Sequence, residues 1–133
     1  MILYMSNINI LANDFEDIRV RVTGLLGYLS MLSSGDFKDE EIPRISESCK
    51  EAIPEIKKKV FGMANEVVNV TNSKLKKKVE ENSLRILMKL DHIHGLLKSK
   101  NYAASSNKWD EEVLVAKSVI IDLSKINDVI KSE

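Results

Sequence analysis

Apolar residues recur every three or four positions along most of this chain, which is the period of an amphipathic α-helix. The first clear series predicts one helix face and comprises Phe15, Ile18, Val22, Leu25, Leu29 and Leu32. Asn13, three residues before Glu16, is expected to cap the start of this helix, and Gly35 suits the left-handed cap at its end. Residues 1–12 are apolar without a clear period, so we expect a separate arm or a short helix there.

The same spacing continues through the middle of the chain and passes a proline. The acidic run 39–41, with Pro43 in the first turn, is typical of a helix start. The apolar series that follows comprises Ile42, Ile45, Cys49, Ala52, Ile56, Val60, Met63, Val67 and Val70. Because Pro54 interrupts this series with little change of phase, we predict two helices, over about 39–53 and 54–70. They are expected to form one kinked rod or two nearly collinear neighbours.

Two further helices are predicted after the polar segment 71–73, which can supply an N-cap. The first, within 73–104, has the apolar lines Val79-Ile86-Ile93 and Ser83-Leu90-Leu97, and Leu84, Leu87 and Leu96 are expected to widen them into a broad face. Residues 98–107 are small and polar and predict a loop. The last helix is expected from about Asn107 to Ile130, with Trp109, Val113, Ala116, Ile120, Leu123, Asn127 and Ile130 along its seam.

These amphipathic segments predict an all-α fold, an up-and-down bundle of four to five helices. The chain has 133 residues, enough for one self-sufficient core, and we place this single domain at 13–133. Five glycines, two prolines and an aromatic share of 5% favour helices, because sheet proteins use these residues in turns and on pleated faces. No segment shows the alternation of a strand.

Charge and cysteine content narrow the classes of function. Twenty basic and twenty acidic residues give a net charge of zero, which argues against a protein whose main task is to neutralise nucleic-acid phosphates. Cys49 is the only cysteine, so no intrachain disulfide or thiolate metal cluster can form, and its place in the apolar series predicts a small core residue. The longest nearly apolar run, 24–32, is shorter than the roughly 20 residues that span a bilayer. We expect a soluble intracellular protein, cytoplasmic or nuclear, without membrane insertion.

The two histidines, His92 and His94, do not indicate a metal site. Two residues apart on a helix, they lie about 200 degrees apart around its axis and cannot hold one ion together. No phosphate-binding loop, dinucleotide fingerprint, nucleophile elbow or zinc-ligand spacing is present, so we expect no cofactor and no enzyme activity. The alternative is a histidine phosphotransfer relay, in which His94, beside Gly95 and one turn before Lys98, accepts phosphate.

Charge is unevenly distributed within this neutral chain. Residues 36–55 carry seven acidic and three basic side chains, whereas residues 56–78 carry seven lysines and one glutamate. The lysines are Lys57, Lys58, Lys59, Lys74, Lys76, Lys77 and Lys78. Such runs are typical of the solvated face of a helix, and the alternative is a patch that contacts a partner or RNA. Only Phe61 lies nearby as a platform for stacking bases.

The segment at the end of the third predicted helix resembles a known family. Its residues Leu96-Leu97-Lys98-Ser99-Lys100-Asn101-Tyr102-Ala103-Ala104 and Ser106-Asn107-Lys108-Trp109-Asp110-Glu111 are similar to the helix, basic turn and Asn-x-aromatic-Asp-Glu segment of one shared domain. This domain occurs in the steroid receptor RNA activator protein and at the C-terminus of the large outer COPII coat subunit. The family is a five-helix bundle used for protein interaction, so the resemblance implies a helical interaction module and assigns no binding residue.

These observations favour a non-catalytic interaction or scaffold module, a small subunit or adaptor in a larger protein assembly. Apolar residues outside the main series are expected to form its interface. Those singled out are Tyr28, Met31, Met88, Tyr102 and Trp109, together with Leu114 and Ile121. We expect a protein partner or a second copy of the chain to cover them, ahead of nucleic acid.

Overall fold

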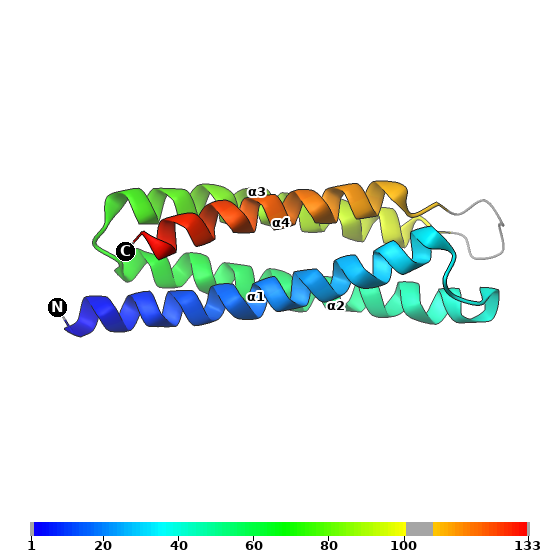
Figure 1. Ribbon diagram of the computed structural model, residues 1–133, viewed down its shortest axis with the longest axis horizontal. Helices are drawn as coiled ribbons and strands as arrows, with labels where there is room; N and C mark the ends of the chain where they lie inside the picture. Colours follow the sequence, from blue (N-terminus) through cyan, green and yellow to red (C-terminus); the bar gives the residue numbers. More distant parts are fainter. Residues whose placement is uncertain (1, 101–107, 133) are drawn as a thin grey trace.

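The protein is an all-α bundle, as the spacing of its apolar residues predicts (Figure 1). The computed structural model describes residues 2–100 and 108–132. Its four α-helices are α1 (Ile2–Ser34), α2 (Ile42–Glu66), α3 (Ser73–Lys98) and α4 (Asp110–Lys131). Two 3-10 turns, η1 (Asp39–Glu41) and η2 (Val67–Asn69), flank α2. No strand is found in the part of the chain that the structure describes.

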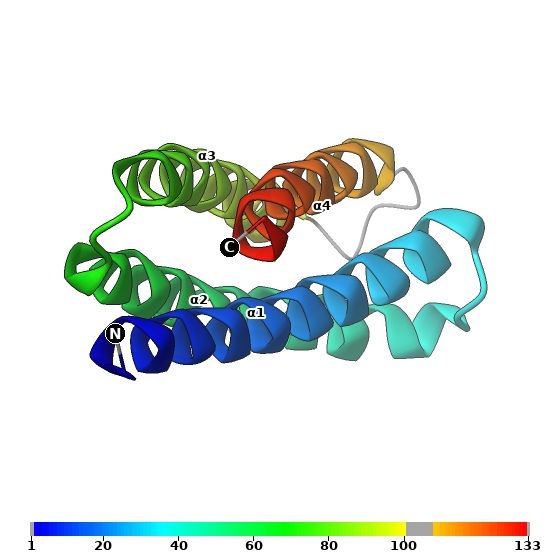
Figure 2. The ribbon, with the colours of Figure 1, turned by 60° about the vertical axis from the view of Figure 1, so that its left-hand side comes forward.

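The helices run up and down in two layers. α1 and α2 form one layer and α3 and α4 the other, and the start of α1 lies at the same end of the bundle as the end of α4 (Figures 1 and 2). Each helix packs against the two beside it, so that α1 contacts α2 and α4 while α3 contacts α2 and α4. This arrangement lets every amphipathic helix turn one apolar stripe toward a common centre.

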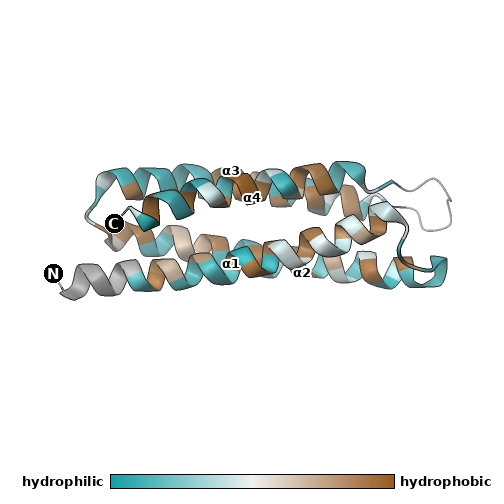
Figure 3. Ribbon diagram, in the orientation of Figure 1, coloured by the Kyte–Doolittle hydropathy of each residue, from teal (hydrophilic) through white to brown (hydrophobic). Residues whose placement is uncertain are grey.

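The apolar series predicted for α1, α2 and α3 form most of that centre (Figure 3). The seam predicted for α4 is wrong at Val113, Ile120, Asn127 and Ile130, which are only half-buried, because the buried face of α4 passes through Val119 and Ile126 instead. Ile18, Val22 and Leu29 of α1 are fully buried, as are Ile86 and Leu90 of α3. The buried face of α3 is narrower than predicted, since Leu84 is 60% exposed while Leu87 and Leu96 are half-buried. The reason is geometric, because a residue two positions from a buried one points roughly 200 degrees away around a helix.

α1 differs from its predicted extent at one end and matches it at the other. The cap expected at Asn13 is wrong, because the helix is continuous from Ile2 and Leu11 is buried on the same face as Phe15. At the far end Gly35 has φ of 73°. The amide of Asp36 donates to the carbonyl of Met31 at 3.0 Å, which completes the predicted left-handed cap.

α2 passes through Pro54 as a single helix. Of the two arrangements predicted, the structure has one rod from Ile42 to Glu66 rather than two neighbouring helices. A proline inside a helix costs about 3 kcal/mol, but burying a large aliphatic side chain contributes roughly 1.5–3 kcal/mol. Ile53 and Ile56, fully buried on either side of the exposed Pro54, therefore outweigh the cost of the proline.

The remaining boundaries follow from capping. The side chain of Asn72 accepts hydrogen bonds from the amides of Lys74 and Leu75 at 3.0 and 3.1 Å, so it supplies the predicted N-cap of α3. α4 begins at Asp110, after the buried Trp109, and has three acidic residues in its first turn, where the helix dipole favours them. The start predicted near Asn107 lies outside the described residues.

Candidate functional site

Two of the three lysines in the first run, 57–59, form ion pairs within the bundle. Lys57 pairs with Asp91 of α3, and Lys59 Nζ lies 2.8 Å from Asp17 Oδ2 of α1. The hydrogen bond from Lys59, supported by one from Arg21, lowers the pKa of the Asp17 carboxyl below its ordinary value. These two lysines therefore connect α2 to its neighbours, and Lys58 alone is exposed to solvent.

The second lysine run, within 74–78, lies in the first turns of α3 and forms no ion pair with another described residue. Lys74, Lys77 and Lys78 are exposed and Lys76 is half-buried. At the α-helical rise, Lys77 lies roughly 20 Å along α3 from the Asp91 that holds Lys57. The structure therefore does not bring the two runs into one basic patch.

The histidines face different neighbours, as their spacing predicts. His92 Nε2 lies 3.2 Å from Glu111 Oε1 of α4 and its side chain is half exposed. Burial lowers the pKa of His94, and the charges of Lys98, Lys57 and Lys50 lower it further. His94 is thus a half-buried, neutral imidazole between α2 and α3 at pH 7. Among the described residues, no group of three or more His, Cys, Asp or Glu side chains is placed to hold a metal ion.

Cys49 is a core residue at the α1–α2 contact. Only 3% of it is exposed, and burial raises the pKa of its thiol to about 11. A thiol with this pKa is almost wholly protonated at pH 7, so it is a poor nucleophile. This environment agrees with the predicted role of a small apolar side chain.

Large apolar side chains are exposed on every helix of the bundle. The residues at least 40% exposed are Ile10, Val20, Tyr28, Met31, Phe61, Val68, Leu84, Met88, Leu114 and Ile121. Five of the interface residues expected from the sequence are among them: Tyr28, Met31, Met88, Leu114 and Ile121. Trp109 is only 4% exposed, so it belongs to the core and not to a surface. Tyr102 lies outside the described residues.

A buried ionic cluster, which the sequence did not predict, joins α3 to the start of α4. Lys100 Nζ lies 2.7 Å from Glu112 Oε2 and 4.6 Å from the centre of the Trp109 ring, and it donates to the Lys108 carbonyl. The Lys100 and Glu112 side chains are 10% and 2% exposed. The sequence shows the basic turn that contains Lys100, but it does not show that Glu112, on the other side of the loop, lies beside this lysine. This cluster also explains why Trp109 is buried, since its ring covers the ammonium group.

A second ion pair fixes α3 against α4 near the middle of the bundle. Lys89 Nζ lies 2.5 Å from Asp122 Oδ2, and the Asp122 side chain is only 3% exposed. Asn82 is also buried in α3 and donates to the Lys78 carbonyl at 2.8 Å. The Lys89–Asp122 pair crosses between the helices and therefore favours one alignment of two otherwise apolar surfaces, whereas the Asn82 bond stays within α3.

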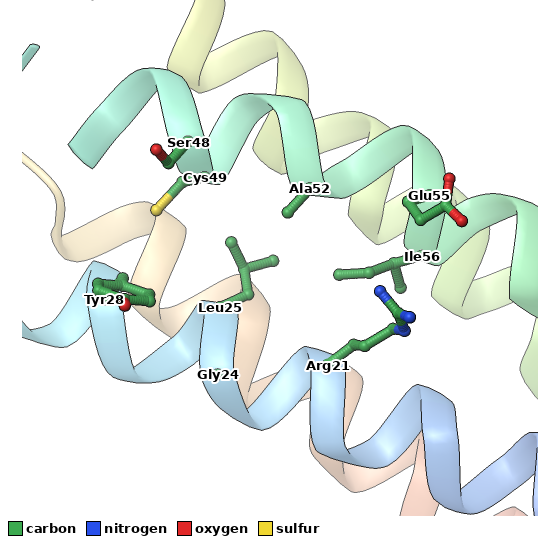
Figure 4. A pocket seen from close by; sticks show the side chains of 9 residues that line it. All are labelled: Arg21, Gly24, Leu25, Tyr28, Ser48, Cys49, Ala52, Glu55 and Ile56. Atoms are coloured by element: carbon green, nitrogen blue, oxygen red, sulfur yellow. The ribbon is translucent and has the colours of Figure 1, made fainter. Parts of the chain in front are cut away.

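A groove of about 230 Å³ with a mostly apolar lining lies between α1 and α2 (Figure 4). Leu25, Ala52 and Ile56 point into it, and the sulfur of Cys49 lies at its side. Its remaining lining residues are Arg21, Gly24, Tyr28, Ser48 and Glu55. This α1–α2 groove places an apolar floor between polar rims, an arrangement suited to binding rather than to proton or group transfer.

No known protein family, curated protein or solved structure matches this chain. Within the described residues, no helix is both long enough and apolar enough to cross a membrane. The chemistry of the chain's own surfaces is therefore the basis for assigning a function.

Proposed function

We propose that this protein is a non-catalytic helical interaction module, a small subunit or adaptor in a larger protein assembly. The observation that carries the proposal is the set of large apolar side chains left at least 40% exposed on a bundle whose core is already filled. Met88 and Leu114 are 64% and 66% exposed, and Tyr28 is 52% exposed. Burying such side chains against a partner contributes roughly 25 cal/mol per Å² of apolar surface removed from water.

Capture of the tagged full-length chain from its native host tests this function. We expect a protein partner at fixed stoichiometry that is lost when Tyr28 and Met31, or Met88 and Leu114, are replaced by serine. These side chains are exposed, so the variants should fold, and circular dichroism verifies this. Lys117→Ser and Lys125→Ser provide a matched control on the exposed surface of α4. A chain that is captured alone and is monomeric at all concentrations would contradict the proposal.

A phosphorelay is the second candidate, supported by the surroundings of His94. Its neutral imidazole can act as a nucleophile, and the charges of Lys98, Lys57 and Lys50 act on it from α3 and α2. A phosphoryl group on the imidazole would gain from these ammonium groups. Acid-labile phosphate from acetyl phosphate or a phosphorylated response regulator, absent in His94→Gln, would favour this candidate. Failure of the wild-type chain to accept phosphate from either donor would exclude it.

A further inference from the structure

We propose that two copies of this chain pack together through their α3–α4 faces, about a two-fold axis parallel to the helices, so that α3 of each copy lies on α4 of the other. The α3–α4 face is the exposed side of these two helices, around Met88 on α3 and Ile121 on α4. The proposal rests on the proposed function as an interaction module and identifies the partner as a second copy of the chain. Exposure, register and charge support it.

Four of the most exposed large apolar side chains lie on the α3–α4 face. They are Leu84 and Met88, 60% and 64% exposed, and Leu114 and Ile121, 66% and 58% exposed. Each comes two residues before a buried residue of its own helix, so it points roughly 200 degrees away from the core. The core lies between the two layers of the bundle, and no described helix covers the outer side of the α3–α4 layer (Figure 2).

Contacts within the chain show the register of α3 against α4. Lys89 pairs with Asp122, and His92 pairs with Glu111, so the two antiparallel helices are level near these residues. A two-fold axis parallel to the helices leaves every height unchanged. The same register therefore applies between α3 of one copy and α4 of the other.

The apolar side chains interlock in this register. At a rise of about 1.5 Å per residue, Ile121 of the second copy is level with the interval between Leu84 and Met88, and its Leu114 is level with the turn before Gly95. Side chains four residues apart on one helix leave a hole that a side chain of a facing helix can fill. A mostly apolar hollow of about 260 Å³ lies at this height of α3. Its lining residues are Arg85, Met88, Lys89 and His92.

Opposite charges also meet in this register. To within about one helical turn, Asp128 of one copy is level with Lys77 and Lys78 of the other, and Lys125 is level with Glu81. None of these five side chains is ion-paired with another described residue. Charge complementarity of this kind selects both a partner and its register, and here the complementary partner is the chain itself.

The apolar contacts supply most of the affinity, because exposed ion pairs contribute little. Lys117 is level with Asp91, which already holds Lys57, and Arg85 has no carboxylate at its level. Replacing Lys117 and Lys125 by serine should therefore leave the dimer in place. Reversing a charge is different, since it brings like charges together at the contact.

Sedimentation equilibrium of the purified full-length chain, between about 1 μM and 1 mM, tests the proposal. We expect the mass to rise from 15.0 kDa toward twice that value and to stop there, because a two-fold contact is closed. Ile121→Asp places a carboxylate in the apolar contact twice per dimer and should weaken dimerisation by about tenfold or more. Val20→Asp is the matched control, since Val20 is 55% exposed but lies on α1, and it should dimerise like the wild type. Circular dichroism verifies that both variants fold.

A charge exchange tests the register between the copies. Asp128→Lys alone, and Lys77→Glu combined with Lys78→Glu, each bring like charges together between identical chains. We expect both variants to dimerise more weakly than the wild type, most clearly at low salt. Mixed in equal amounts, the two variants should form a heterodimer, because each α4 then meets the opposite charge. Recovery on mixing reports only contacts between chains.

Four results would overturn the proposal. They are a wild-type monomer at every concentration, growth past the dimer, a dimer that Ile121→Asp leaves intact, and the absence of a heterodimer in the mixture.

Failure of this proposal is distinguishable from failure of the proposed function. If the purified chain is monomeric but a native partner is captured and is lost with Met88 and Leu114, the face belongs to a different protein and the interaction module stands. If the purified chain is monomeric and no native partner is captured, both fail.

Discussion

Glu112 is a carboxylate inside the bundle, and Lys100 is the cation beside it. Lys100→Met should lower the free energy of unfolding by about 3–5 kcal/mol, because it leaves a buried charge without compensation. Urea denaturation at neutral pH measures this change. The double variant Lys100→Met with Glu112→Gln should recover most of the loss, since the uncompensated charge is then removed.

Arg44→Met is the control for this change, because Arg44 is exposed and lies 4.0 Å from its nearest carboxylate, that of Glu41. It should alter the free energy of unfolding by no more than about 0.5 kcal/mol. An equally small effect for Lys100→Met would show that Glu112 is solvated in solution and would contradict the buried cluster.

His94 should make stability depend on pH near neutrality. Its pKa in the folded state lies below the ordinary 6.5, so below that pH the unfolded chain binds more protons than the folded one. The stability that neutral His94 contributes is fully present above pH 6.5 and is lost as the pH falls through the folded-state pKa. Urea denaturation between about pH 7 and pH 5 should therefore show a smaller decrease for His94→Gln than for the wild type. Equal decreases would contradict the lowered pKa.

Pro54 offers a test of α2 as a continuous helix. Pro54→Ala supplies an amide to the helix and removes the clash of the ring with the preceding turn, so it should raise the free energy of unfolding by up to about 3 kcal/mol. Glu51→Ala, an exposed change one turn earlier, should stay within about 0.5 kcal/mol. A loss of stability in Pro54→Ala, measured by urea denaturation, would indicate that the chain needs a break at this position.

Helix periodicity was predictable from local sequence because it depends only on which residues share a face. It located the seams of α1, α2 and α3, the cap at Gly35 and the buried Cys49. On α4 it found Ala116 and Leu123, but the buried line continues through Val119 and Ile126 and not through the predicted Ile120 and Asn127. It failed at Asn13, where a good capping residue lies in the interior of a helix whose earlier residues pack on the same core. Capping preferences of about 1 kcal/mol are too weak to end a helix when the next turn buries an apolar residue such as Leu11.

The surface contacts could not be predicted in this way, because they join residues far apart in the chain. Lys57 and Lys59 look like members of a free basic run, but their partners Asp91 and Asp17 come from other helices. The α1–α2 groove also depends on how two helices approach each other. No sequence pattern separates the residues that line it from the rest of α1 and α2.

The whole molecule has one acidic and one basic end along its long axis. The acid-rich segment 36–55 begins at the end where α2 starts, and the lysines that open α3 lie at the other end (Figure 1). Because the free lysines are few and lack aromatic neighbours, we expect no retention of single-stranded RNA in a gel-shift assay near 0.15 M salt, where the Debye length is about 8 Å. Salt-sensitive retention that disappears in the double variant Lys77→Glu with Lys78→Glu would instead support a nucleic-acid binder.

The native size of the protein tests its role in an assembly most directly. The chain alone has a mass of 15.0 kDa. In a fresh extract of the native host, analysed by size-exclusion chromatography with immunodetection, we expect the wild type to elute in a larger complex. The combined variant Tyr28→Ser, Met31→Ser, Met88→Ser and Leu114→Ser should elute at the size of the free chain. Elution of the wild type as a free monomer would contradict the interaction module.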